Sequence, residues 1–163
     1  MRPSALRVVV ADSSPLIALA RLDLLALLDR LFDQVQVPTV VFAECVARPE
    51  LADARRIQAA ADRGAFVLCE AQPVQAPGLD AGESYAIGRA LEIDAALLAD
   101  DLAARRYALA RHLVVIGTLG VLVRAKHQGM VPLLRPLIES LLAGGHRLGE
   151  SAVAQALHAA GES

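Results

Sequence analysis

The sequence has little of what marks several specialised classes of protein. It has two cysteines, Cys45 and Cys69, in no metal-type spacing, so we expect small buried thiols in a reducing compartment. The formal net charge is −2, which excludes a protein that coats nucleic acid through bulk positive charge. The apolar stretch 113–123 is well short of the roughly 18 residues of a membrane-spanning helix. Since no basic segment followed by an apolar segment opens the chain, we expect no signal peptide and a cytoplasmic protein.

What the sequence contains is enough apolar material for one folded domain. Of its 163 residues, 55% are hydrophobic and 21% are charged, which excludes disorder and allows a sizeable core without disulfides or metals. We predict a single domain over residues 1–163, in which about 133–163 form a C-terminal helical extension.

Strand-like and helix-like patterns alternate almost to the end of the chain, which predicts an α/β fold with a central parallel sheet and helices on both faces. Gly and Pro mark residues 72–79 as the clearest loop. The predicted strands are 7–11, 35–37, 66–68, 96–99 and 114–116. The predicted helices are 14–31, 38–47, 51–63, 80–92, 102–111, 117–128, 133–142 and 151–160.

Two of the predicted strands run directly into carboxylates. Asp12 follows the first strand, and Asp100 and Asp101 follow the fourth. Ligands bind outside the carboxyl ends of the strands in open α/β sheets, and carboxylates gathered there need a cation or a proton. Ser14 is a candidate N-cap with Pro15 behind it, which leaves Asp12 for the crevice. We expect Asp100 to be a ligand and Asp101 to cap the next helix or support the site.

Two glutamates are further candidates, each with a structural alternative. Glu44 is the one charge in the apolar segment 40–47, so it is either a buried functional acid or the solvent-facing stripe of its helix. Glu83 lies three residues after Asp80, which also fits a capping box. Mg²⁺ and Mn²⁺ prefer oxygen ligands, and sites with few carboxylates typically also bind phosphate oxygens of a substrate. These acids together therefore favour metal-assisted hydrolysis.

Other polar residues have simpler interpretations. Thr118 follows a strand as a candidate N-cap for its helix. We interpret all four histidines as surface or helix-end residues, because they show no ligand spacing. They are His112, His127, His146 and His158.

The ordered set of motifs resembles the PIN-domain nucleases, and more specifically their VapC-like toxin branch. The likeness runs from about residue 8 to the end of the chain, and its later part resembles a subgroup of uncharacterised PIN-like proteins. The segments that carry it are VADSSPLI (10–17), PTVVFAE (38–44), GESYAI (82–87), LLADDLAAR (97–105), GTLGVL (117–122) and residues 126–131.

The resemblance implies a PIN-like three-layer α/β/α sandwich with a five-stranded parallel sheet. It implies a Mg²⁺- or Mn²⁺-dependent endoribonuclease that cleaves single-stranded RNA, a small antitoxin partner and a homodimer. The implied metal-binding quartet is Asp12, Glu44, Glu83 and Asp100, with Asp101 as a neighbouring ligand. The hydroxyl of Ser14 is implied to assist at the site. Many relatives have Asp where Glu83 stands.

The sequence offers few candidates for the basic surface that a ribonuclease needs to bind phosphate groups. Arg105, Arg106 and Arg48 are candidates for phosphate contacts, although each alone is more readily a solvated surface residue. Two other functions remain open. One is a non-catalytic PIN-like module that binds RNA or protein, and the other is a phosphatase or receiver-like protein that uses Asp12 as phospho-acceptor, for which Lys126 is the only lysine.

Overall fold

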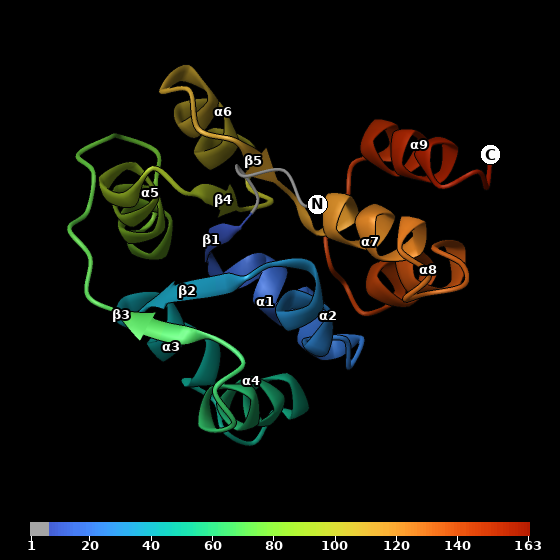
Figure 1. The fold of residues 1–163 in the computed structure, drawn as a ribbon, viewed down its shortest axis with the longest axis horizontal. Helices are drawn as coiled ribbons and strands as arrows, with labels where there is room; N and C mark the ends of the chain where they lie inside the picture. Colours follow the sequence, from blue (N-terminus) through green and yellow to red (C-terminus); the bar gives the residue numbers. More distant parts are fainter. Residues whose placement is uncertain (1–6) are drawn as a thin grey trace.

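A parallel five-stranded sheet forms the centre of residues 7–163, the part of the chain described by a computed structural model (Figure 1). The strand order is β3-β2-β1-β4-β5, and each neighbouring pair is parallel. The strands are β1 (Val8–Ala11), β2 (Gln34–Pro38), β3 (Val67–Cys69), β4 (Ala96–Leu98) and β5 (Val115–Ile116). The structure therefore confirms the predicted α/β fold with its central sheet.

The two central strands, β1 and β4, are apolar along their length because both of their faces are covered. Val9 and Val10 are fully buried, and so are Leu97 and Leu98, as expected for strands inside a parallel sheet. Val9 pairs with Val35 of β2 on one side and with Ala96 of β4 on the other. The strand order thus changes direction between β1 and β4, and this is the place where open α/β sheets bind ligands.

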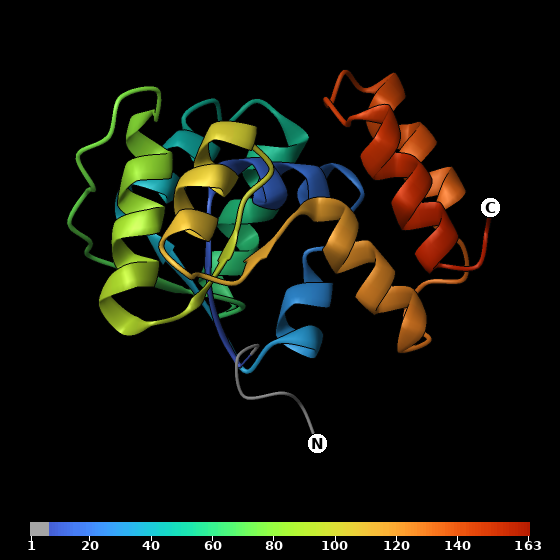
Figure 2. The same ribbon diagram turned by 90° about the horizontal axis from the view of Figure 1, so that it is seen from above.

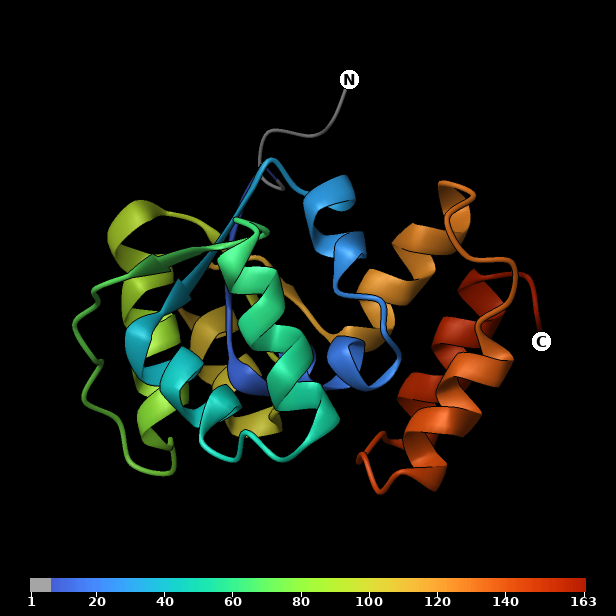
Figure 3. The same cartoon turned by 90° about the horizontal axis from the view of Figure 1, so that it is seen from below.

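Helices cover both faces of this sheet. Figure 1 shows α5 and α6 on one side of the sheet and α1, α2, α4 and α7 on the other. The views from above and below place α8 and α9 together at one end of the molecule, beside α7 (Figures 2 and 3). The bounds are α1 (Ser13–Arg21), α2 (Ala26–Leu31), α3 (Thr39–Val46), α4 (Ala52–Asp62), α5 (Ala81–Ile93), α6 (Leu102–Ala110), α7 (Thr118–His127), α8 (Arg135–Ala143) and α9 (Glu150–Ala159).

The prediction of one continuous helix over 14–31 is wrong, because the chain forms two helices there, α1 and α2. α1 ends at Arg21, and Asp23 adopts a left-handed conformation with φ of 57°. Aspartate tolerates this conformation better than most residues. The apolar positions continue across the break, since Leu22 and Leu24 still pack against the core, and this continuity hides the turn in the sequence.

Two other expectations concern thiols and membranes. Cys45 is buried, whereas Cys69 is only half-buried, so the prediction of two buried thiols is wrong for Cys69; neither thiol is in a disulfide. Among the helices of residues 7–163, none combines the length and the apolar character that crossing a membrane requires.

Candidate metal centre

Asp12 lies at the end of β1, inside the protein. Its peptide N–H donates to the Leu98 carbonyl oxygen of β4 at 2.9 Å, and the residue is 3% exposed. Asp12, rather than Ser14, occupies the N-cap position of α1, but within the described residues its side chain makes no capping hydrogen bond. Its Oδ1 is buried and has no hydrogen-bond partner among residues 7–163. A buried carboxylate oxygen without a partner is costly unless a cation or a proton compensates it.

The surroundings of Asp12 disfavour its charge. Burial raises the pKa of Asp12 to about 7, the Ser13 peptide N–H opposes this rise, and the negative charges of Asp80, Glu83 and Glu44 add to it. Acids from distant parts of the sequence therefore act on one carboxyl group at the edge of the sheet. A cation bound there would displace the proton and relieve the repulsion.

Glu44 reaches this region from α3. The residue is exposed on its helix, but its carboxylate lies against the first turn of α5, where a Cβ at Gly82 would be 2.7 Å from Oε2. Burial and the charge of Asp80 raise the pKa of Glu44, and the Gly82 peptide N–H lowers it. Of the two interpretations that the sequence left open for Glu44, a fully buried helix does not hold, because within α3 only Val41 and Cys45 are buried. The helix packs on α1, α4 and α5 and leaves its remaining face open.

Glu83 caps its own helix, and its charge also acts on Asp12. Its peptide N–H donates to Asp80 Oδ1 at 2.8 Å, and its own Oε2 accepts from the Asp80 peptide N–H at 3.0 Å. The predicted capping box is thus confirmed. Burial raises the pKa of Glu83, and the same carboxylate is one of the charges that raise the pKa of Asp12.

Asp100 follows β4 and is held by donors from three segments. Thr118 donates from its peptide N–H to Oδ1 at 2.7 Å and from its hydroxyl to Oδ2 at 2.6 Å. Ser14 donates to Oδ2 at 3.2 Å, and His146 Nε2 lies 3.5 Å from the same oxygen. Burial alone raises the pKa of Asp100, but these contacts with His146 and Thr118 outweigh it, so the pKa is lowered. Asp100 therefore remains a carboxylate at neutral pH.

Asp101 points elsewhere and caps the following helix. It is exposed, and its Oδ2 accepts from the Ala104 peptide N–H at 3.0 Å in the first turn of α6. Of the two acids after β4, the helix-capping role thus belongs to Asp101.

The predicted acids gather at one edge of the sheet but do not form a closed cage. Asp12 and Asp100 follow neighbouring strands, and Glu44 and Glu83 approach Asp12 from α3 and α5. In residues 7–163, no three acid, histidine or cysteine side chains are arranged to hold a metal ion by themselves. Mg²⁺ is usually bound by one or two carboxylates and keeps several waters. The orphaned Oδ1 of Asp12 fits such an open site.

Thr118 and His146 are the two contacts of Asp100 that the sequence interpretation missed. Thr118 is not the N-cap of α7, which is Gly117, because its hydroxyl and its peptide N–H both turn to Asp100. The prediction of a surface histidine is wrong for His146, whose side chain is 8% exposed. The pair Gly144-Gly145 marks the α8–α9 turn in the sequence, but nothing in the sequence shows that this turn folds back to Asp100.

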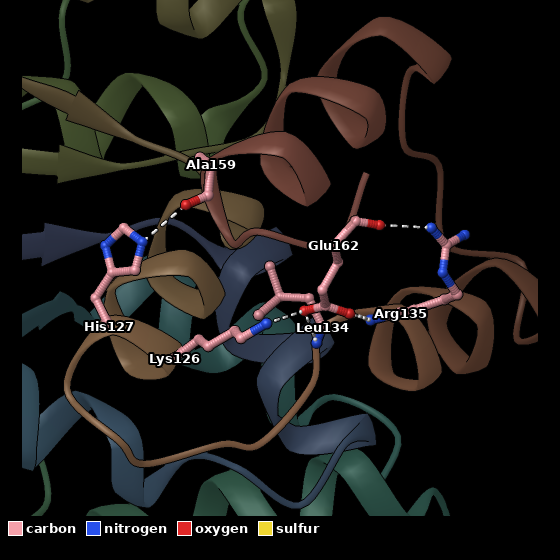
Figure 4. Close-up of polar contacts among 6 residues, drawn as sticks. All are labelled: Lys126, His127, Leu134, Arg135, Ala159 and Glu162. Atoms are coloured by element: carbon pink, nitrogen blue, oxygen red, sulfur yellow. Dashed lines mark hydrogen bonds and ion pairs between the residues drawn. The ribbon is translucent and has the colours of Figure 1, made fainter.

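The basic residues are distributed unevenly around this edge. Arg105 donates to the Ala99 carbonyl oxygen at 3.0 Å, whereas Arg48 pairs with Glu50 and Arg106 is exposed. Lys126 bonds Glu162 at 2.8 Å near the end of α7 (Figure 4). Since Thr118 begins this helix at the site, Lys126 lies about 12 Å along the helix axis from it, so no lysine assists Asp12 as in a receiver-like protein.

Comparison with known proteins identifies similar chains. Residues 8–162 match a family model described as "DUF3368: PIN domain". A solved structure of a PilT N-terminus domain protein from the hyperthermophilic archaeon Sulfolobus solfataricus P2 has a similar fold, with a TM-score of 0.56 at 20% sequence identity. The similarity covers 72% of this chain and 92% of that one. No curated protein matches the chain.

Proposed function

We propose that this chain, which belongs to the PIN-domain family of nuclease-type modules, is a metal-dependent endoribonuclease that hydrolyses phosphodiester bonds in single-stranded RNA. The observation that carries the proposal is the buried Oδ1 of Asp12, which has no partner among residues 7–163 and lies where the strand order reverses. A carboxylate in that position is suited to a cation and has no evident structural task.

Asp12 and Asp100 would hold Mg²⁺ or Mn²⁺, with Glu44 and Glu83 facing the same space. When bound, the ion supplies a lowered pKa for water and compensates negative charge on the phosphate. The protein's own contribution is to keep Asp100 ionised and oriented through Ser14, Thr118 and His146. An ion held by one or two carboxylates keeps several waters, which phosphate oxygens of a substrate would replace.

The proposal extends to a role as the toxin of a type II toxin–antitoxin pair. The VapC-like motifs around Asp12, Glu44 and Asp100 support this role, and with it a small antitoxin that covers the acidic site and a homodimeric toxin. Induced expression of the chain should then arrest growth, and Asp12→Asn should abolish the arrest. Undiminished arrest by this variant would contradict the proposal.

The direct test is cleavage of a fluorescent single-stranded RNA by the full chain with and without Mn²⁺. We expect cleavage to require the ion and to be abolished by Asp12→Asn, because an amide cannot replace the anionic ligand. Asp53→Asn is the matched control, since Asp53 is an aspartate of α4 that is also largely buried and pairs with Arg21 outside the site. Circular dichroism melting establishes that both variants fold. Equal cleavage by Asp12→Asn and wild type would refute the assignment.

A non-catalytic PIN-like module that binds RNA or protein is the second candidate. It is favoured by one observation, namely that no ready cluster of three ligands is present in residues 7–163. Calorimetric titration with Mn²⁺ separates the two candidates. Binding that Asp12→Asn removes supports the nuclease, and absence of binding at millimolar metal supports the module.

A further inference from the structure

A groove opens directly beside Asp100, between α7 and the C-terminal helix α9. Its volume is about 770 Å³, within the range of about 300–1,000 Å³ typical of ligand sites, and thus large enough to hold a nucleotide. Asp100, one of the acids of the candidate metal centre, lines the groove together with Arg105. The groove therefore reaches the proposed site of cleavage through Asp100.

The groove concentrates positive charge in a protein whose net charge is −2. Arg105, Arg124 and Arg147 line it, and Asp100 is the one acid among its lining residues. Within residues 7–163, the guanidinium groups of Arg124 and Arg147 have no ion-pair or hydrogen-bond partner. Arginines without partners beside a carboxylate site are suited to phosphate groups, which they bind in a bidentate manner.

Most of the other residues that line the groove have small or aliphatic side chains. Leu119 and Val123 of α7, Ala152 and Ala156 of α9, and Leu148 before α9 all line the groove. The alanines are small, while the larger aliphatic side chains supply apolar surface against which a base can be buried. The combination of apolar floor and cationic rim is complementary to a nucleotide.

We propose that this groove binds the single-stranded RNA next to the scissile phosphate, with the base on the apolar floor and the flanking phosphates on Arg124 and Arg147. This inference rests on the proposed function, because the scissile phosphate is placed at Asp12 and Asp100. It assigns to α9, which lies outside the central sheet and its covering helices, the role of one wall of the substrate site. An acidic protein segment is the competing occupant, but the continuity with Asp100 favours RNA.

The test is binding of a fluorescein-labelled ten-nucleotide oligouridylate to the full chain by fluorescence anisotropy. All variants carry Asp12→Asn so that hydrolysis does not consume the probe. Ala152→Glu places a negative charge in the groove. Ala154→Glu is its matched control, because Ala154 is also an exposed alanine of the same helix and does not line the groove. We expect Ala152→Glu to weaken binding about tenfold or more and Ala154→Glu to leave it unchanged, since one added charge faces the phosphates and the other faces solvent.

The arginines are tested in the same assay at several salt concentrations. Arg124→Gln and Arg147→Gln should each weaken binding about three- to tenfold and reduce the slope of log affinity against log salt by about 1. Arg63→Gln, at the exposed end of α4, is the control and should leave both quantities unchanged.

The outcomes separate this inference from the proposed function. Equal binding by Ala152→Glu and Ala154→Glu, together with unchanged salt slopes for both arginine variants, would overturn the groove assignment even if wild type cleaves RNA, and would leave the groove to a protein partner. Groove-dependent binding without any metal-dependent cleavage by wild type would support the groove and refute the hydrolase.

Discussion

At the scale of single residues, Gly82 sets how closely Glu44 approaches α5. We predict that Gly82→Ala lowers metal-dependent cleavage without destabilising the protein. The new Cβ would lie within 2.7 Å of the Glu44 carboxylate, which is the mobile end of a flexible side chain and would be displaced. Alanine in place of glycine inside a helix favours folding by up to about 1 kcal/mol. Cleavage rates and melting temperatures measure the two effects, and unchanged cleavage would show that Glu44 need not lie there.

We predict that His146 contributes to metal binding through its contact with Asp100. Because it touches Asp100 and no substrate group, we regard it as a positioning residue. His146→Ala should weaken Mn²⁺ binding in calorimetry about 10- to 100-fold, the range measured for residues that support a metal ligand. His146→Gln, whose amide nitrogen can replace Nε2, should recover part of the affinity, whereas a purely packing role would give equal losses in both variants.

The acids of the site were predictable from the sequence, and their supporting residues were not. Asp12 and Asp100 directly follow apolar runs, so local pattern places them at strand ends. Thr118 and His146 reach Asp100 from 18 and 46 positions further along the chain, and no local pattern encodes such pairing. Glu44 remained ambiguous in the sequence because only the neighbouring helix shows what its carboxylate faces.

At the scale of elements, α5 packs unusually closely against the extended segment before it. A Cβ at Gly88 would overlap the carbonyl oxygen of Gln72, and the Val74 peptide N–H donates to the Ser84 carbonyl oxygen at 3.1 Å. The loop that Gly and Pro predict over 72–79 is therefore held along the helix.

Gly88→Ala should destabilise the protein, in contrast to Gly82→Ala in the same helix. The obstacle at position 88 is backbone, which cannot move aside as a side chain does, and overpacking of this kind costs about 1–3 kcal/mol. Urea denaturation midpoints of the two variants measure the difference. Equal midpoints would mean that the segment around Gln72 can shift away from α5 and make room for the new methyl group at no cost in stability.

Element boundaries show what the sequence encodes at this scale. Five strands and most helices follow from alternating periodicity, since buried parallel strands are continuous apolar runs. The break between α1 and α2 depends on Asp23, whose left-handed backbone leaves no clear mark among the surrounding leucines.

At the scale of the whole molecule, one carboxylate near the end of the chain joins the last three helices. Glu162 accepts from Lys126 Nζ at 2.8 Å, from the Leu134 peptide N–H at 2.7 Å and from the Arg135 peptide N–H at 3.1 Å (Figure 4). The Glu162 carbonyl oxygen also accepts from Arg135 Nη2 at 3.0 Å. The Glu162 carboxylate thus caps the start of α8 and pairs with a lysine of α7.

This arrangement predicts a defined dependence of stability on pH. The Leu134 peptide N–H and Lys126, opposed by burial, lower the pKa of Glu162 to about 2, against about 4.3 in an unfolded chain. Its contribution to stability is therefore complete above about pH 4.3 and is lost as the pH falls through 2. Glu162→Gln should lower the melting temperature at pH 7 and differ little from wild type near pH 2.

Glu139→Gln is the control for that measurement, because Glu139 is an exposed acid of α8. It should track wild type from pH 7 to pH 2. A constant difference between Glu162→Gln and wild type across this range would show that the carboxylate charge is not what joins the helices.

Glu162 follows α9 and binds the start of α8, so it closes the chain from α8 through α9 into a loop. The turn that carries His146 lies inside this loop, with Nε2 3.5 Å from Asp100 Oδ2. Loss of the Glu162 contacts is therefore expected to loosen the last two helices and to weaken the support of Asp100 as well.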